Sequence, residues 1–447
     1  MSIPIVPARF EPTSLVREGS VHSLLYTDPA CFAREMQAIY ESTWVFIGHE
    51  SEVPTRGDYV RRTMGLVPVL MIRSAADEIS VVANRCAHRG NLLCQEAKGK
   101  KRSLACQYHG WVFSLTGKLL DVPFPIGFQQ DKDSHSLRQA RVGRYRGFVF
   151  ATLAADGPTL EEHLGHARQA LDRAAMLSPV GELDLHGGWV KHLYRANWKM
   201  LAENNVDGYH VNYVHDSFAR GIKVQYKYDN VLVTKENEVA AVARDLGNGH
   251  AEIDYAPTYA KPLVWLGVEP DRYPAYTAAM QAAYGDARAT EILRAGPPHT
   301  FVFPNLFVAE TAVTMIQPLA ADKSVNWHTP LYLKGVPPEI NRRLLRLGEA
   351  ALGPSAFLLA DDAIISERQW RALEGSPIWM DLSRGLERES LAADGTRSAH
   401  YSDETPQRGF WRHYKTIFEA PAAPASATEP PPCAAVGMAD AASEPAL

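Results

Sequence analysis

The chain contains the segment Cys86-Ala87-His88-Arg89-Gly90 and then the segment Cys106-Gln107-Tyr108-His109-Gly110-Trp111. Each segment pairs one thiol with one imidazole. Two thiolates on one iron and two imidazoles on the other would complete a [2Fe-2S] centre with a raised reduction potential. A structural zinc site could use the same four ligands, and chance clustering among five cysteines and sixteen histidines is the other alternative. The pattern favours the iron–sulfur centre, and hence a redox protein.

Glycine follows each ligand pair, as Gly90 and as Gly110. Glycine lets the backbone approach a cluster where a side chain would clash. Main-chain N–H groups of such loops can donate hydrogen bonds to the cluster sulfurs and so help to set the potential. This is the Rieske arrangement, with the predicted ligands Cys86, His88, Cys106 and His109.

Composition limits the class of protein. A length of 447 residues predicts two domains, possibly three. The net charge of −5, with both signs interspersed, argues against nucleic acid or anionic lipid as a partner. Five cysteines are too few for a disulfide framework once two are cluster ligands, which fits a reducing compartment. Without a signal peptide or an apolar run of about 18 residues, we expect a soluble cytoplasmic protein.

Hydrophobic periodicity suggests how the chain is organised. Residues 30–44 read as an amphipathic helix, and short alternating or apolar runs such as 67–72, 79–83 and 147–151 then indicate a small antiparallel β domain. A helical period returns at 158–177. We therefore predict four parts: an N-terminal helical segment at 1–44 packing on the catalytic domain, a Rieske domain at 45–155, a catalytic domain at 156–420, and a disordered Pro- and Ala-rich tail at 421–447.

The predicted fold class is α+β. Beyond the β domain, strand-like runs at 231–234, 311–316 and 331–333 alternate with helical stretches. We interpret this larger region as an antiparallel sheet that packs against helices on one face.

A second cluster of metal-binding residue types lies between 197 and 215. In one continuous helix Glu203, Asp207 and His210 would share a face, whereas His215 requires the helix to distort or end. Two imidazoles and one distant carboxylate would make the facial triad of oxygen-activating non-haem Fe(II). A polar helix face with hydrogen-bonded histidines is an equally good interpretation of the spacing.

The best candidate for the carboxylate is the pair Asp361-Asp362, which stands between the apolar runs 357–359 and 364–365. Acids in such a setting need a reason to lie near a core. The alternative is the N-terminus of a helix, where aspartate is favoured by capping and by the macrodipole.

These motifs together resemble a known family. Residues 25–415 resemble the catalytic α subunit of Rieske non-haem iron ring-hydroxylating oxygenases, through the two cluster segments and the run from Asn197-Trp198-Lys199 to His215, all in family order. The resemblance implies His210 and His215 as iron ligands and Asp362 as the carboxylate ligand, with Asp361 as the fallback. It also implies that Asp207 bridges an iron-ligand histidine and, across a subunit interface, a Rieske histidine of the neighbouring subunit.

Within that family, residues 202–210, 26–28 and 49–54 are similar to the benzoate, toluate and anthranilate dioxygenase group. After His215 the chain has Asp216-Ser217-Phe218, where benzoate enzymes typically have Trp-Asn-Tyr, so the pocket is expected to differ. We expect a cationic or amide group to bind a substrate carboxylate, but sequence does not identify it.

The resemblance implies the reaction and the partners. No Gly-rich dinucleotide fingerprint follows a strand, so NAD(P)H is expected to act only indirectly, through a reductase with flavin and an iron–sulfur cluster, with or without a ferredoxin. Both atoms of O2 would enter the ring of a benzoate-like acid to give a cis-dihydrodiol. An α3 trimer, or an α3β3 hexamer with small β subunits, is implied.

Two alternatives to this reaction remain open. The first is a Rieske monooxygenase, a hydroxylase or demethylase acting on an aromatic amine, salicylate or a related aromatic. The second is a Rieske electron carrier whose other domain is a binding module.

Overall fold

The computed structural model describes residues 11–128, 132–218, 220, 240–309, 312–353 and 356–420. The predicted strand at 231–234 and the predicted tail at 421–447 lie outside these residues. Among the described helices, none combines the length and the apolar character that crossing a bilayer requires.

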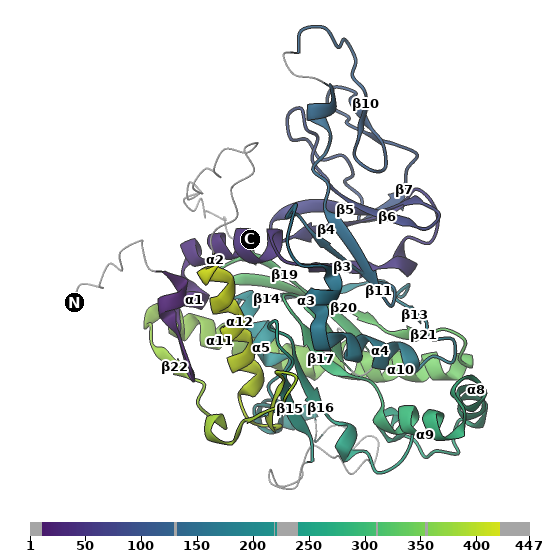
Figure 1. Ribbon diagram of the computed structural model, residues 1–447, viewed down its shortest axis with the longest axis vertical. Helices are drawn as coiled ribbons and strands as arrows, with labels where there is room; N and C mark the ends of the chain where they lie inside the picture. Colours follow the sequence, from purple (N-terminus) through teal and green to yellow (C-terminus); the bar gives the residue numbers. More distant parts are fainter. Residues whose placement is uncertain are drawn as a thin grey trace, which may run out of the picture.

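Three small antiparallel sheets build the part of the chain that carries the two Cys-His segments. Their strand orders are β6-β5-β4-β7, β10-β9-β8 and β11-β12-β3. Strand β10, which belongs to the same sheet as β8 and β9, lies toward the tip of the molecule in Figure 1, away from its body. The strands are β3 (Val45–His49), β4 (Asp58–Met64), β5 (Val67–Ala75), β6 (Glu78–Ala83), β7 (Lys98–Lys100), β8 (Leu104–Ala105), β9 (Val112–Phe113), β10 (Leu119–Asp121), β11 (Arg141–Tyr145) and β12 (Phe148–Thr152).

A nine-stranded antiparallel sheet forms the centre of the larger region, in the order β14-β20-β19-β18-β17-β16-β15-β24-β23. Most of its strands are buried on both sides and rich in β-branched and aromatic residues, as strands covered on both faces require. The strands are β14 (Val190–Tyr194), β15 (Val242–Asp245), β16 (Ala251–Asp254), β17 (His299–Val302), β18 (Leu306–Ala309), β19 (Ala312–Ala320), β20 (Lys323–Pro330), β23 (Ser390–Leu391) and β24 (Arg397–His400).

Helices cover both faces of this sheet, rather than one face as the sequence suggested. The first hydrophobic core contains Phe301, Phe307 and Ile316 from one face, together with helices α5 (Trp198–Asn204), α11 (Phe357–Gly375) and α12 (Thr405–Glu419). The second core contains Val302, Val308 and Val313 from the other face, together with α4 (Arg168–Met176), α8 (Pro274–Tyr284), α9 (Asp286–Ala295) and α10 (Pro338–Leu352). Alternation of side chains along each strand separates the two cores.

The N-terminal segment packs on the catalytic region. It forms α1 (Leu24–Thr27) and α2 (Pro29–Glu35), which continues as a π-helix over Met36–Glu41. The predicted helix is therefore present, although its second half is more loosely wound. Lys199 at the start of α5 donates from Nζ to Glu35 Oε1 at 2.6 Å, and both side chains are fully buried. Removing one partner of such a pair typically costs about 3–5 kcal/mol, so this contact fixes α5 in place.

Smaller elements complete the fold. A three-stranded sheet joins β1 (Val16–Arg17) and β2 (Ser20–His22) to β22 (Trp379–Asp381), and β13 (Leu183–Asp184) pairs with β21 (Tyr332–Leu333). The short helices are α3 (Leu160–Leu164) and α6 (Val211–Val214). The whole is an α+β architecture, as predicted.

Two candidate metal centres

The two Cys-His loops have the same backbone hydrogen-bond pattern. In the first, the N–H of Cys86 donates to Asn91 O at 2.8 Å and the N–H of Gly90 donates to Cys86 O at 2.9 Å. In the second, the N–H of Cys106 donates to the carbonyl of Trp111 at 2.8 Å and that of Gly110 donates to Cys106 O at 3.0 Å. Both glycines have positive φ, +76° and +72°, which explains why glycine ends each ligand pair.

These loops place the two sulfurs inside and the two imidazoles further out. Both cysteine side chains are buried, and their sulfurs contact one another. Backbone amides of His88 and Arg89 donate to the Cys86 sulfur, and those of Tyr108 and His109 donate to the Cys106 sulfur. The predicted N–H donors to sulfur are therefore present.

The two imidazoles lie side by side, with ring centroids 4.7 Å apart. Trp111, which is buried, stacks on His88 at 4.8 Å between centroids. The Nδ1 atom of His88 is buried without a hydrogen-bond partner among the described residues. Two adjacent thiols beside two adjacent imidazoles, one with an orphan nitrogen, fit the ligand set of a Rieske centre.

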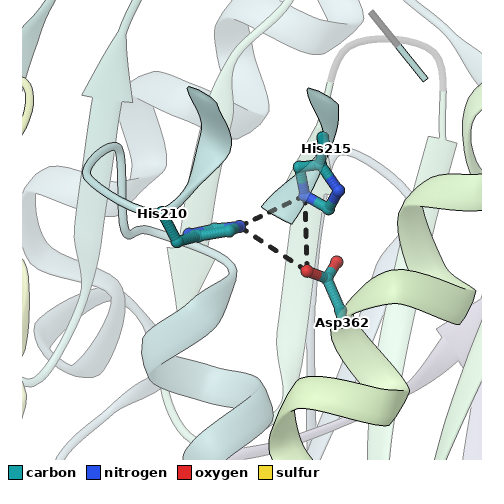
Figure 2. A group of neighbouring side chains, drawn as sticks. All are labelled: His210, His215 and Asp362. Carbon is teal, nitrogen blue, oxygen red and sulfur yellow. Dashed lines mark hydrogen bonds and ion pairs between the residues drawn. The ribbon is translucent and has the colours of Figure 1, made fainter. Parts of the chain in front are cut away.

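The second centre lies where two short helices meet the long helix α11. Asn197 caps the start of α5, accepting from Lys199 N at 3.1 Å, and the helix ends at Asn204. A short loop follows, and α6 begins directly after His210 and ends directly before His215. Figure 2 shows both imidazoles and the Asp362 carboxylate from α11 pointing toward one another.

Three atoms form the core of this centre. The Nε2 atoms of His210 and His215 are 3.2 Å apart, and Asp362 Oδ1 lies 3.6 Å from the first and 3.3 Å from the second. Asn204 Nδ2 donates to the same Oδ1 at 3.2 Å. Two imidazoles and one carboxylate that offer atoms within 4.8 Å of one another fit the facial triad of non-haem Fe(II).

The segment from residue 197 to residue 215 is not one continuous helix. Glu203 and Asp207 do not share a helix face, because α5 ends at Asn204. Glu203 instead points into the core, where it accepts from Tyr26 Oη at 2.8 Å and from the indole N–H of Trp411. Burial raises the pKa of Glu203 to about 7. Because helix α5 ends at Asn204, the loop that follows can turn and bring the two histidines together.

A carboxylate stands behind each of the two histidines. Asp207 Oδ2 lies 3.7 Å from Nδ1 of His210, and Asp207 Oδ1 accepts from the backbone N–H of Tyr209 at 2.6 Å. Asp361 Oδ2 lies 3.7 Å from Nδ1 of His215. Asp361 therefore faces the outer side of a ligand imidazole, while Asp362 faces the inner side. Carboxylates in such positions orient metal-binding histidines and raise their basicity.

These charges set the protonation of the site. Burial lowers the pKa of His210, but Asp207 and Asp362 outweigh it and raise that pKa to about 9. Burial also acts on Asp207, favouring its neutral form, yet hydrogen bonds from His210 hold its pKa below the ordinary value. Since a ligand imidazole must be neutral, protons compete with a metal ion at His210.

Comparison with protein families agrees with this geometry. The Rieske [2Fe-2S] domain matches residues 43–130, and the ring hydroxylating alpha subunit (catalytic domain) matches residues 175–420.

The chain belongs to the ring-hydroxylating alpha subunit family.

Curated relatives of this ring-hydroxylating alpha subunit include subunits of two dioxygenases and of one N-demethylase. The large subunit of 2-halobenzoate 1,2-dioxygenase from Burkholderia cepacia is 31% identical, over 81% of this chain and 79% of the relative. Toluate 1,2-dioxygenase subunit alpha from Pseudomonas putida is 32% identical, over 76% and 75%. The alpha subunit of N,N-dimethyl phenylurea N-demethylase from a Sphingobium species is 29% identical, over 80% and 81%.

Solved structures show the same fold. Naphthalene 1,2-dioxygenase with indole bound in the active site superposes with a TM-score of 0.76 at 26% identity, covering 90% of this chain and 93% of that one. Ring-hydroxylating alpha subunits combine a Rieske [2Fe-2S] centre with a mononuclear iron, and both corresponding domains are present here. The predictions of family, enzyme class and cofactors are thereby confirmed.

Proposed function

We propose that this alpha subunit is the terminal oxygenase component that inserts both atoms of O2 into the ring of a benzoate-like aromatic acid, giving a cis-dihydrodiol. The observation that carries the proposal is the convergence of His210, His215 and Asp362 on one point. A Rieske electron carrier whose second domain only binds a ligand would not need this triad. The halobenzoate and toluate relatives support an aromatic acid as the substrate.

We assign Cys86, His88, Cys106 and His109 as ligands of the [2Fe-2S] cluster, and the triad as ligands of Fe(II). When bound, the cluster supplies single electrons and the ferrous ion supplies dioxygen activation. The backbone amides that donate to the two sulfurs tune the potential of the cluster. Asn204 holds the Asp362 oxygen by its amide donor, so that the carboxylate keeps its orientation.

Electron transfer would pass between neighbouring subunits. Figure 1 shows strand β10, close to the cluster loops, at the tip of the molecule and helix α5 within its body, so the two centres of one chain are well separated. His109 is exposed, and an imidazole at the surface can contact an adjacent chain. Asp207 beside His210 is the proposed bridge to a Rieske histidine of the neighbour. This route requires an α3 ring, with or without three small β subunits.

A separate NAD(P)H reductase, acting directly or through a ferredoxin, is the proposed electron source. We place the reaction in the cytoplasm, since the described cysteines Cys31, Cys86, Cys94 and Cys106 form no disulfide.

Isotope labelling tests the reaction. The holoenzyme is incubated with benzoate, a chemical or enzymatic reductant, and 18O2, and the product is examined by mass spectrometry. Two labelled oxygen atoms in a cis-dihydrodiol are expected. If none of the aromatic acids tested gives a product that contains 18O, the proposal is overturned.

The second candidate is monooxygenation, which the demethylase relative favours. The same ligands serve both reactions, so only the product distinguishes them. One labelled oxygen atom, or formaldehyde released from an N-methyl substrate, would select this candidate.

A further inference from the structure

Four polar side chains lie next to one another on one face of β14, β20 and β19. Antiparallel pairing places His192 opposite Asn326 and Thr314 opposite His328. Because side chains alternate along a strand, residues 326 and 328, which are two apart on β20, point to the same side. We call these four residues, His192, Asn326, His328 and Thr314, the polar row.

Each residue of the polar row has at least one buried polar atom without a hydrogen-bond partner among the described residues. His328 is fully buried, and neither of its ring nitrogens has a hydrogen-bond partner among the described residues. The same holds for His192 Nε2, Asn326 Oδ1 and Thr314 Oγ1 within the described part of the chain. Thr329, which pairs with Val313 and points to the opposite face, also has a buried hydroxyl without a partner among the described residues. Buried polar atoms are nearly always paired, so four adjacent exceptions point to a ligand.

The polar row lies on the side of the sheet that faces the triad. Helix α11 packs against β14, and Leu359 and Asp362 are among its buried residues. Tyr194, at the end of β14, donates from its hydroxyl to Leu359 O at 3.1 Å and accepts a hydrogen bond from the Asn326 side chain. The negative charge of Asp362 acts on Tyr194. Tyr194 therefore links the row, through Asn326, to the part of the molecule that holds the Asp362 carboxylate.

The side chains of the polar row are uncharged. Burial, helped by the neighbouring His192, lowers the pKa of His328 to about 4, so this imidazole is neutral at physiological pH. Burial likewise lowers the pKa of His192. A neutral imidazole offers one donor and one acceptor, a hydroxyl offers both, and the free atom of Asn326 is an acceptor. The row thus presents donors and acceptors in a mixture, with no cation among its members.

We propose that the polar row binds an uncharged hydrogen-bonding substituent of the substrate ring, a hydroxyl or a primary amino group. This inference rests on the proposed function and names a feature of its substrate. An ionised carboxylate accepts but does not donate, so it would leave Asn326 Oδ1 and the imidazole lone pairs facing negative charge. The carboxylate of the substrate therefore binds elsewhere. An acid without the substituent leaves the polar groups of the row unpaired, and it therefore binds more weakly than an acid that carries the substituent.

Binding to the anaerobic holoenzyme tests the inference. Isothermal titration gives the dissociation constants of benzoate and of its 2- and 3-hydroxy and 2- and 3-amino derivatives. At least one hydroxy or amino derivative should bind tenfold or more tightly than benzoate. Equal affinities, tightest binding of benzoate, or no measurable binding of any derivative would overturn the proposal.

Two isosteric variants provide a matched comparison. Thr314→Val removes a hydroxyl of the polar row, whereas Thr329→Val removes a buried hydroxyl on the opposite face of the same sheet. The preference for the substituted acid should fall severalfold in Thr314→Val and stay unchanged in Thr329→Val. His328→Leu should remove the preference altogether. An equal effect of the two threonine variants would contradict a role for this face.

Turnover of the same compounds under 18O2 separates the two proposals. Labelled product from every acid, without any preference in binding, would retain the proposed function and refute the polar row. A preference in binding that responds to Thr314→Val, without labelled product from any compound, would support the row and refute the oxygenation.

Discussion

The two candidate metal centres are built in opposite ways. The loops around Cys86 and Cys106 are each closed by hydrogen bonds within six residues, and the same pattern is used twice. The triad instead joins His210 and His215 to Asp362, which is about 150 residues away on another helix. The first site depends on local backbone geometry, and the second depends on how α5, α6 and α11 pack.

This difference predicts that each of the two metal centres can be lost while the other stays intact. Loss of a cluster ligand should leave the triad intact, since no ligand is shared. Damage to the packing of α11 should affect the triad and spare the cluster loops.

The largest effect is expected from Asp362→Asn. The neutral amide keeps the shape but is a poor ligand for Fe(II), so iron should fall from about three to about two atoms per chain while about two sulfides remain. Turnover should drop by roughly a thousandfold or more. Iron and sulfide analysis with the visible spectrum checks this. The complementary control, Cys106→Ser, should lose sulfide and visible absorption; loss of sulfide in Asp362→Asn would contradict independent sites.

Acid should weaken the catalytic region before the cluster loops. Burial lowers the pKa of His250 and His299 to about 4 and that of His413 to about 3, and all three lie in the catalytic part of the chain. In the unfolded state each of these three histidines gains a proton near pH 6.5, whereas in the folded state it is still neutral at that pH. The stability that the neutral histidines contribute to the folded state is therefore complete above pH 6.5. It is lost as the pH falls toward 4, on the order of 3 kcal/mol for each histidine.

Urea unfolding between pH 7.5 and 4.5, followed by tryptophan fluorescence, measures this loss. The variant His250→Leu should be less stable at pH 7.5 but show a shallower pH dependence. A pH dependence equal to that of the wild type would exclude His250 as a contributor.

Asp207→Asn should affect both iron affinity and electron transfer. The variant cannot hold His210 by its carboxylate charge, so Fe(II) should bind up to about a hundredfold more weakly. Reoxidation of the reduced cluster, followed by its absorbance after mixing with O2 and substrate, should also slow when Fe(II) is saturating. Normal reoxidation with weakened iron binding would restrict Asp207 to positioning His210.

The smallest effect is expected from Asp361→Asn. Asp361 lies 3.7 Å from Nδ1 of His215 and accepts from Ser217 Oγ at 3.3 Å, outside the triad. Its loss should weaken Fe(II) binding by roughly tenfold, measured by titration of the apo mononuclear site. Complete loss of that iron would make Asp361, rather than Asp362, the ligand.

The comparison also explains what could be predicted from the sequence. The cluster loops were predictable because ligand spacing and the two glycines specify their geometry locally. The spacing indicated that a helix carrying His210 must distort or end before His215, and α6 does end at Val214, but the end of α5 at Asn204 and the position of Glu203 were not predicted. Helical spacing would place Glu203 on the face of His210 only in one continuous helix, and the contacts with Tyr26 and Trp411 show that it points into the core instead.

The polar row had no signal in the sequence. His192 and His328 stand in ordinary strand patterns, 136 positions apart. Their proximity arises from pairing of β14 with β20, which nothing in either strand reveals alone. The unpaired state of their nitrogens depends on every neighbour in the fold.

The sequence by itself therefore determined the family, the α+β class and the cluster loops, because motifs a few residues long fix their own backbone. Only the tertiary structure decided that Asp362 faces the two histidines while Asp361 stands behind one of them, and that a polar row lies on the adjoining strands. Those arrangements depend on helix packing and strand pairing between distant segments, which local spacing does not encode.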